Sequence, residues 1–520
     1  MASKPCGLFR SGPSQKDTHS LEKTVSYLLR VKETGPSPYR IVSDQLLPSN
    51  KSDDRAQTGA NSQNLNHRVR RHEQLTRVYV LSERTANEEQ SRFMATGVVV
   101  RGPAAASVAK EPTSVEQTGL ELSIIADLAL KLIFYNNQIN GQAISDEICL
   151  PFFNIVDKAL MMLKKEELIE VAGSNGFGEL AYQYSITPKG GLRVHSLLER
   201  TTYVGPAPIT LDQYKAIVKQ QAISEMRVGP AEVREALADL VLEENVIDAM
   251  GQAVNTGRSL FLFGPPGNGK TILAEHITTL LGGAVLIPYC FTVDGQIIKV
   301  LDLHNHVPLP VNGRPEWDRR FVLCRRPSLI TGGELTLEVL DLVYDRFARI
   351  YEAPLQVKAN GGMLLVDDFG RQQVQPRQLL NRWIVPLEKR VDFMTLHTGK
   401  KIEIPFDQLV VFSTNLAPKD LVDEAFLRRI QNKIHVTNPT VEIYREIFKR
   451  QCEALNVPFD QNGLVYLLRE YYVKPKRELR SVHPRDILRT LVGIARYHDT
   501  PPVLTQHLLD RACQTYFVDV

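Results

Sequence analysis

A glycine-rich loop between an apolar run and an apolar helix constrains this chain more than any other feature. The run Leu260–Phe263 has the length and composition of a buried strand, and Ile272–Leu281 has those of a helix. Between them lies a G-x-x-x-x-G-K-[ST] pattern, in the strand–loop–helix context that it requires. Its residues are Gly264, Pro265, Pro266, Gly267, Asn268, Gly269, Lys270 and Thr271. The sequence therefore predicts a phosphate-binding loop.

Each part of this loop suits the binding of a triphosphate. The glycines let the backbone curl so that successive N–H groups face the phosphates, and the helix N-terminus adds a favourable dipole. We expect Lys270 to reach the β- and γ-phosphates, and the Thr271 hydroxyl to ligate Mg²⁺.

Two more apolar runs end in polar residues that suit the same chemistry. Gly361–Val366 precedes Asp367 and Asp368, and Leu409–Ser413 is followed by Thr414 and Asn415. In a parallel α/β sheet such strand ends lie at the edge where ligands bind. We expect Asp367 to hold Mg²⁺, directly or through water, and Asp368 to orient and deprotonate the attacking water. The Asn415 amide can help to place that water.

The order of these motifs resembles that of the AAA+ ATPases. The strand tip at Asn415 is followed by Asp423-Glu424-Ala425-Phe426-Leu427-Arg428-Arg429 and, later, by His483-Pro484-Arg485-Asp486. The resemblance covers roughly residues 225–520. It implies a wedge-shaped α/β domain, an α-helical lid, ATP with Mg²⁺ as cofactors, and assembly into a ring, usually a hexamer.

The resemblance also implies roles for individual residues. Asn415 resembles the sensor 1 residue, and Arg485 matches the sensor 2 arginine of the lid. Arg428 and Arg429 match the segment that supplies an arginine finger to the neighbouring subunit. Most members carry Glu where this chain has Asp368. The Asp carboxylate is one methylene shorter and reaches about 1.5 Å less far toward the water, which bears on the hydrolysis rate and not on nucleotide binding.

Part of the chain is similar to the MoxR and magnesium-chelatase side of this superfamily. The similarity rests on the stretch from Asn360 to Asp368, on Leu379–Trp383, and on a hairpin-like segment from Arg390 to Ile404. All three precede the strand that ends at Asn415. We therefore place the chain on that side as a sequence-based prediction.

Residues 113–202 resemble a winged-helix module, in which three helices are followed by a two-stranded wing. Winged-helix modules contain a helix-turn-helix pair and often bind DNA through the second helix of that pair. Here the outward face of that helix mixes basic and acidic residues, whereas phosphate binding needs a basic stripe. DNA contact stays open but is not favoured over protein docking or a structural role. The outward residues are Asn154, Asp157, Lys158, Lys164 and Lys165, followed by Glu166 and Glu167.

Charge and composition divide the chain into four segments. Residues 1–112 are rich in Ser, Gln, Asn and Pro, and we expect them to be largely disordered. Residues 1–110 hold 17 Lys and Arg against 10 Asp and Glu, although the whole chain has a net charge of only +3. We expect the winged-helix-like module at 113–202, an α/β core with an N-terminal connector at 203–437, and a helical lid at 438–520.

The composition favours a cytoplasmic protein. The N-terminus lacks the apolar core of a secretory signal, and no run of about 18 uncharged apolar residues could form a transmembrane helix. The six cysteines are spread over the chain, and none forms a C-x-x-C pair. Free thiols in a reducing compartment are therefore expected.

The sequence as a whole predicts a Mg²⁺-dependent AAA+ ATPase that forms a homo-oligomeric ring. Hydrolysis of ATP would drive remodelling or assembly of a protein partner in a chaperone-like manner. Two alternatives stay open. The first is a nucleic-acid-directed ATPase with the winged helix on DNA, and the second is an ATP-binding scaffold with little turnover.

Overall fold

The structure of the protein is a computed structural model that describes residues 109–174, 176–311, 313–421 and 424–517. Residues 1–108 of the segment predicted to be disordered therefore lie outside the described residues. Asp423 of the predicted arginine-finger motif also lies outside them. The segment boundaries at 112, 202 and 437 stay predictions. Among the described residues, no helix is long and apolar enough to cross a membrane.

A five-stranded sheet forms the centre of the α/β part, with the strand order β10-β13-β16-β5-β17. Every neighbouring pair in it is parallel. The carboxyl ends of β5, β13 and β16 therefore lie at one edge. The strands are β5 (Ser259–Phe263), β10 (Ser328–Thr331), β13 (Met363–Val366), β16 (Leu409–Thr414) and β17 (Asn432–His435).

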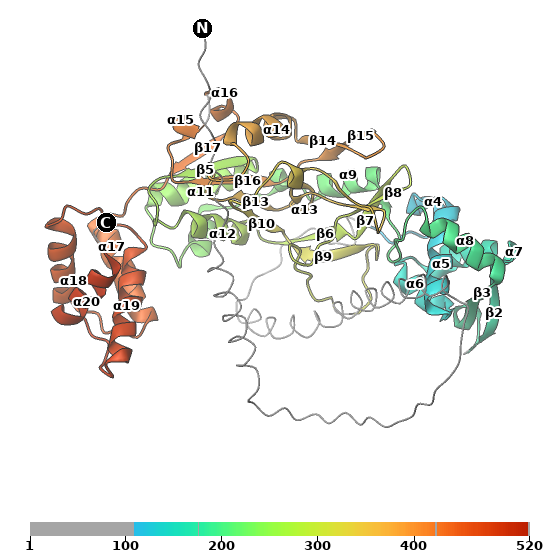
Figure 1. The fold of residues 1–520 in the computed structure, drawn as a ribbon, viewed down its shortest axis with the longest axis horizontal. Coiled ribbons are helices and arrows are strands. Elements are labelled where there is room, and N and C mark those ends of the chain that lie inside the picture. Colours follow the sequence, from blue (N-terminus) through green and yellow to red (C-terminus); the bar gives the residue numbers. More distant parts are fainter. Residues whose placement is uncertain (1–108, 175, 312, 422–423, 518–520) are drawn as a thin grey trace, which may run out of the picture. The chain divides into compact units, whose positions relative to one another are not determined.

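Helices cover both faces of this sheet, which explains why its strands are continuously apolar. Along β5, Leu260 and Leu262 pack into a core with α10, α11 and α12, whereas Phe261 packs into the opposite core with α14. Figure 1 shows α12 and α14 on the two sides of the sheet. The helices are α10 (Pro230–Ala236), α11 (Glu244–Thr256), α12 (Lys270–Leu281) and α14 (Pro376–Lys389).

A second sheet, which the sequence did not lead us to expect, has the order β11-β12-β8-β7-β4. Two strand pairs, β6 with β9 and β14 with β15, flank it. Together with α9 (Leu211–Gln220) and α13 (Leu355–Lys358) they enclose a separate hydrophobic core. The strands are β4 (Ile209–Thr210), β6 (Ala284–Pro288), β7 (Cys290–Val293), β8 (Gln296–Lys299), β9 (Phe321–Arg325), β11 (Val343–Asp345), β12 (Ile350–Glu352), β14 (Val391–Thr395) and β15 (Lys401–Pro405).

The first described part of the chain combines helices with a small antiparallel sheet in the order β1-β3-β2. Apolar residues before and within α7 are buried, among them Ile155 and Leu163, and α7 begins only at Asp157, so Asn154 lies outside the helix. Strand β1 lies beside β3, so the sheet has one strand more than the predicted wing. The elements are α4 (Val115–Thr118), α5 (Leu122–Asn136), β1 (Gln138–Asn140), α6 (Gly141–Glu147), α7 (Asp157–Lys165), β2 (Ile169–Ser174), β3 (Tyr182–Ile186) and α8 (Pro188–Leu198).

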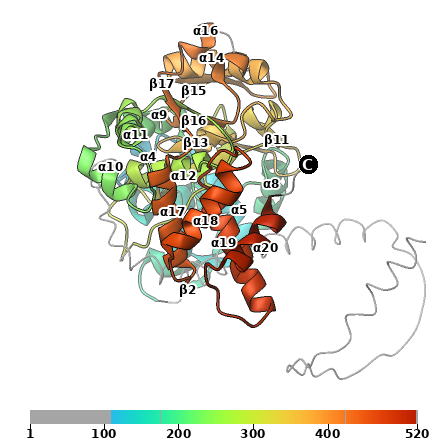
Figure 2. The same cartoon turned by 90° about the vertical axis from the view of Figure 1, so that its left-hand side faces the viewer.

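The C-terminal part is helical and has its own core. Figure 2 shows α17, α18, α19 and α20 from the side on which they lie next to one another. The helices are α17 (Val441–Ala454), α18 (Gln461–Leu468), α19 (His483–Tyr497) and α20 (Gln506–Tyr516). Along the chain, α15 (Pro418–Leu421) and α16 (Glu424–Leu427) lie between β16 and β17 of the parallel sheet. The predicted fold class, a parallel-sheet α/β domain with a C-terminal helical region, is confirmed.

Candidate nucleotide site

The glycine-rich loop connects the end of β5 to the start of α12, at the edge where β13 and β16 also end. Gly264 opens the loop with a φ of 143°. A Cβ atom at this position would lie 2.1 Å from the carbonyl oxygen of Val436. A side chain at position 264 would therefore collide with the segment that follows β17. Glycine is required here both by this close approach and by the positive φ.

Lys270 stands at the centre of the site. Its Nζ donates hydrogen bonds to the carbonyl oxygens of Gly264, at 3.0 Å, and Pro265, at 2.9 Å, and to Oδ1 of Asn415, at 2.7 Å. Burial lowers the pKa of Lys270, while the negative charges of Asp367 and Asp368 oppose that shift. The loop and the tip of β16 thus hold the ammonium group against the phosphate-binding backbone.

Thr271 and Asp367 form the oxygen-rich part of the site. The Thr271 hydroxyl donates a 2.8 Å hydrogen bond to Oδ2 of Asp367. A hydroxyl and a carboxylate at this separation suit Mg²⁺, which takes oxygen ligands and usually uses one or two carboxylates together with substrate phosphates. Among the described residues no group of three or more His, Cys, Asp or Glu could hold a metal. The Thr271 hydroxyl and the Asp367 carboxylate fit a magnesium ion that also takes phosphate ligands.

Asp368 follows Asp367 but faces solvent. It adopts a left-handed backbone conformation, with a φ of 47°, and its N–H donates to Oδ1 of Asp367 at 2.9 Å. Its own Oδ1 accepts a 3.3 Å hydrogen bond from Nδ2 of Asn415. Asn415 therefore contacts Lys270 through its oxygen and Asp368 through its nitrogen. The structure brings together the predicted residues of all three strand ends.

The tips of β13 and β16 are locked to each other directly after these carboxylates. The N–H of Phe369 donates to the carbonyl oxygen of Ser413 at 2.7 Å, and the Thr414 hydroxyl donates to the carbonyl oxygen of Phe369 at 2.7 Å. The Phe369 ring is buried against Phe261 and Phe412. This packing fixes the direction in which the chain leaves Asp368.

The three predicted arginines contact acids outside this cluster. Arg428 donates to Glu424 at 2.9 Å, and its side chain is 76% exposed. Arg429 donates to Glu388 of α14 at 2.5 Å. Arg485, in the first turn of α19, donates to Asp486 at 2.9 Å. The structure thus leaves Arg428 largely in solvent and pairs each of the three with a neighbouring acid.

Sequence reasoning missed the contacts between the loop and the helical region. The N–H of Val482 donates to the carbonyl oxygen of Gly267 at 2.8 Å. Asn268, which motif matching treats as an arbitrary loop position, accepts a hydrogen bond from the N–H of Ser481 at 3.1 Å. The sequence signal that could have indicated these contacts was a polar residue, Asn268, at a position of the loop that the motif leaves open.

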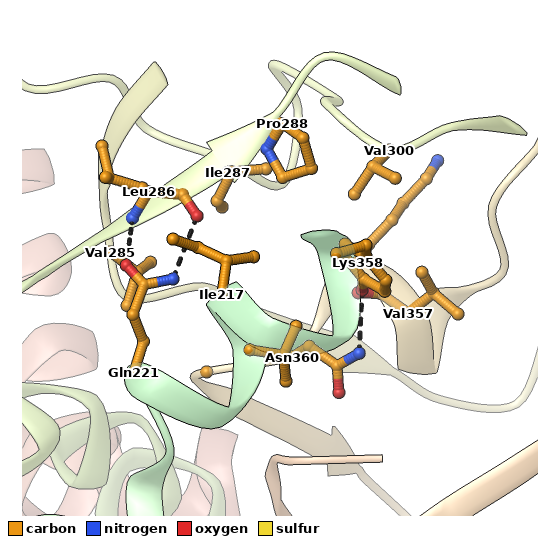
Figure 3. A pocket seen from close by; sticks show the side chains of 13 residues that line it. Ile217, Gln221, Val285, Leu286, Ile287, Pro288, Val300, Val357, Lys358 and Asn360 are labelled. Carbon is orange, nitrogen blue, oxygen red and sulfur yellow. Dashed lines mark hydrogen bonds between the residues drawn. The ribbon is translucent and has the colours of Figure 1, made fainter. Parts of the chain in front are cut away.

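Figure 3 shows a cavity elsewhere, between α9, β6 and α13. The side chain of Gln221 pairs with the backbone of Leu286, and Nδ2 of Asn360 donates to the hydroxyl of Tyr214 at 2.9 Å. The cavity volume of about 20 Å³ is close to the minimum for one water molecule. Its lining shares no residue with the nucleotide site, and we assign it no ligand.

Comparison with known proteins gives partial matches. Residues 440–515 match the model of a domain of unknown function, DUF8689. The chain is 22% identical to spastin of Anopheles gambiae over 46% of its own length and 23% of that protein. It is 25% identical to spastin of Ixodes scapularis, over 53% of its own length and 33% of that protein. The chain thus spans about a quarter to a third of these relatives.

Two solved structures are also similar. A RuvB mutant of Thermotoga maritima has 12% sequence identity and a TM-score of 0.30, covering 57% of this chain and 72% of that one. NtrX of Brucella abortus in complex with ADP has 13% identity and a TM-score of 0.33, covering 62% and 60%.

The sequence similarity to spastin supports the resemblance to AAA+ ATPases that was drawn from the motifs. The class that fold and site define is an α/β protein with a parallel sheet and a phosphate-binding loop. The finer placement on the MoxR and magnesium-chelatase side stays a prediction, and so does the winged-helix assignment.

Proposed function

We propose that this chain binds ATP with Mg²⁺ and hydrolyses it. The observation that carries the proposal is the hydrogen bond between Thr271 and Asp367, directly beside the ammonium group of Lys270. A cation and a hydroxyl from the start of α12 and a carboxylate that follows β13 meet at the edge of a parallel sheet where nucleotides bind. Similarity to spastin supports the same class of activity.

The residues divide the work of the reaction. Backbone N–H groups of the loop and the Lys270 ammonium bind the β- and γ-phosphates, and Thr271 and Asp367 hold the magnesium ion. When bound, that ion neutralises charge that develops on the phosphate oxygens. The Asp368 carboxylate accepts a proton from the water that attacks the γ-phosphorus, while the bond to the leaving ADP oxygen breaks. Asn415 orients the Asp368 carboxylate.

The binding half of this proposal is tested by titration of the full chain with ATP. Replacing Lys270 by alanine removes the cation that faces the β- and γ-phosphates. We expect the Lys270→Ala variant to lose measurable ATP affinity. The matched control is Arg346→Ala, which removes a cation from the loop between β11 and β12 and should leave ATP affinity unchanged. Undiminished affinity of Lys270→Ala would remove the phosphate-loop assignment.

We also propose that the chain assembles into a homo-oligomeric ring, a hexamer by the family pattern, and that Arg428 or Arg429 acts on the nucleotide of the next subunit. The exposure of Arg428 supports this role, because a finger must be free to enter a neighbour's site. Arginine fingers raise the rate by about 10³–10⁵-fold in well-studied systems. The competing explanation is a pair of surface ion pairs with Glu424 and Glu388.

Mixed rings separate these explanations. A variant with both arginines changed to alanine should bind ATP but hydrolyse it poorly, and Lys270→Ala should not bind ATP. In a mixture, the Lys270→Ala subunit supplies an intact finger to the intact phosphate loop of the arginine variant. We expect hydrolysis to return in part. A mixture that assembles but stays inactive would rule out action between subunits.

We propose remodelling of a protein partner as the use of this activity, with residues 113–202 as a winged-helix-like docking module. The exposed face of α7 supports protein docking over DNA, because acidic residues flank its lysines on both sides: Asp157 precedes Lys158, and Glu166 and Glu167 follow Lys165. DNA-stimulated hydrolysis with a steep salt dependence would favour the nucleic-acid alternative instead. Ring formation with ATP but negligible turnover would favour the scaffold.

The five described cysteines are free thiols, and we propose the cytoplasm as the compartment of the protein.

A further inference from the structure

Asn268 lies inside the phosphate loop but points its side chain at other segments of the chain. Only 5% of the residue is exposed. Its Nδ2 donates a 2.8 Å hydrogen bond to Oδ1 of Asn438, and its Oδ1 accepts the 3.1 Å hydrogen bond from the N–H of Ser481. Both ends of the amide therefore have partners, and these partners are about 170 and 213 residues away along the chain.

The two partners belong to the parts that connect the sheet to the helical region. Asn438 lies between β17 and α17, and its Nδ2 donates to Glu478 at 3.1 Å. Ser481 lies in the segment directly before α19. One residue further, the N–H of Val482 donates to the carbonyl oxygen of Gly267. The loop thus holds the connection and the start of α19 by three hydrogen bonds.

We infer that Asn268 is a positioning residue that couples the phosphate loop to the helical lid. The inference rests on the proposed ATPase function. Any movement of the loop around bound phosphates is carried by the Asn268 amide to Ser481 and hence to the first turn of α19, where Arg485 lies. Movement of the lid is carried back to the loop in the same way, because coupling between two sites is reciprocal.

The chemistry of an amide explains why asparagine is needed for this link. Asn438 needs a donor and the Ser481 N–H needs an acceptor, and a single amide supplies both. Alanine supplies neither group. Neither contact uses the backbone N–H groups of the loop, which remain available for phosphates. Loss of the side chain should therefore affect the lid more than nucleotide affinity.

The first test is amide hydrogen exchange of the full chain without nucleotide. In Asn268→Ala, exchange at Ser481 should become at least about tenfold faster than in the wild type, because the acceptor of its hydrogen bond is gone. Asn438→Ala, which leaves the loop sequence intact, should speed exchange at Ser481 to a smaller extent. Asn462→Ala, an exposed asparagine of α18, is the matched control and should change neither value.

The second test measures whether the substitution changes kcat or KM for ATP. Asn268→Ala should lower kcat for ATP by about tenfold and change KM by less than about threefold, because a misplaced lid affects the reaction more than binding. The double variant with Asn438→Ala should lose less than the sum of the two single losses, because the two side chains share one hydrogen bond.

Two results would overturn the inference. One is unchanged exchange at Ser481 in Asn268→Ala, and the other is a loss carried wholly by KM with kcat retained. If the wild type does not hydrolyse ATP, the proposed function fails, but the exchange measurement still decides whether the link exists. The two failures are therefore distinguishable.

Discussion

At the scale of single residues, the site depends on which strand ends meet. The spacing of motifs was enough to predict that Thr271 and Asp367 lie together, because each follows a buried parallel strand that ends at the same edge. The contact of Asn415 with both Lys270 and Asp368 could not be derived in the same way. It depends on side-chain directions at the tip of β16, which no local pattern fixes.

Asp368 gives the sharpest prediction at this scale. Asp368→Asn removes the proposed base and keeps the shape of the side chain. We expect ATP affinity to stay within about threefold and kcat to fall by about 10²–10⁴-fold, the usual range for loss of a general base. Single-turnover hydrolysis measures this. Asp294→Asn, an exposed acid on the β7–β8 turn, is the matched control, and equal rates for the two variants would refute the role of Asp368.

At the scale of elements, the sequence was informative where elements are long and apolar and less so where they are short. The second sheet consists of strands of two to four residues, which carry little periodic signal. One signal was nevertheless present. Asp294-Gly295 joins β7 to β8, with φ values of 49° and 73°, as in the type I′ turns that favour Asp-Gly. The rest of the sheet comes from distant segments, and only tertiary packing assembles it.

The start of α19 gives a prediction of pH dependence. His483 is buried, and its Nδ1 contacts the hydroxyl of Tyr472 at 3.0 Å. Burial, followed by the charges of Arg480 and Arg477, lowers the pKa of His483 from 6.5 to about 4, although Asp486 opposes this. Between pH 6.5 and about pH 4, His483 is protonated in the unfolded chain but remains neutral in the folded chain. This contribution to stability is therefore complete above about pH 6.5 and is lost as the pH falls toward 4.

Urea unfolding between pH 7 and pH 4 checks this sign. The free energy of unfolding of the wild type should fall faster over this range than that of His483→Gln, which has no group that titrates there. The difference between the two curves isolates the histidine from carboxylates that titrate in both proteins. Parallel curves would show that His483 is protonated equally in the folded and unfolded states.

At the scale of the whole molecule, the described chain begins with residues that are tied to the α/β part. The carbonyl oxygen of Ala109 accepts a hydrogen bond from the N–H of Asp318 at 3.0 Å. Glu111 forms ion pairs with Arg314, at 2.9 Å, and Arg319, at 3.2 Å. The basic segment defined from composition extended to residue 112, because composition averages over residues and cannot show where contacts begin.

Deletion series should locate this limit. Removing residues 1–108 should change the melting temperature by less than about 2 °C, because that segment is poor in long apolar runs and deletion spares Ala109 and Glu111. Removing residues 1–114 should lower it further, because the contacts with Asp318, Arg314 and Arg319 are lost. Thermal unfolding of both truncated chains decides, and a large effect of the shorter deletion would show a folded region before Ala109.

Our proposal for the whole chain is that it hydrolyses ATP with Mg²⁺ at the site formed by Lys270, Thr271 and Asp367. The most direct measurement is steady-state phosphate release by the full chain, with and without Mg²⁺, beside the Lys270→Ala variant. We expect phosphate release by the wild type that stops when Mg²⁺ is chelated, and no release by the variant. Phosphate release by Lys270→Ala at the wild-type rate, or none by a folded wild type with ATP and Mg²⁺, would contradict it.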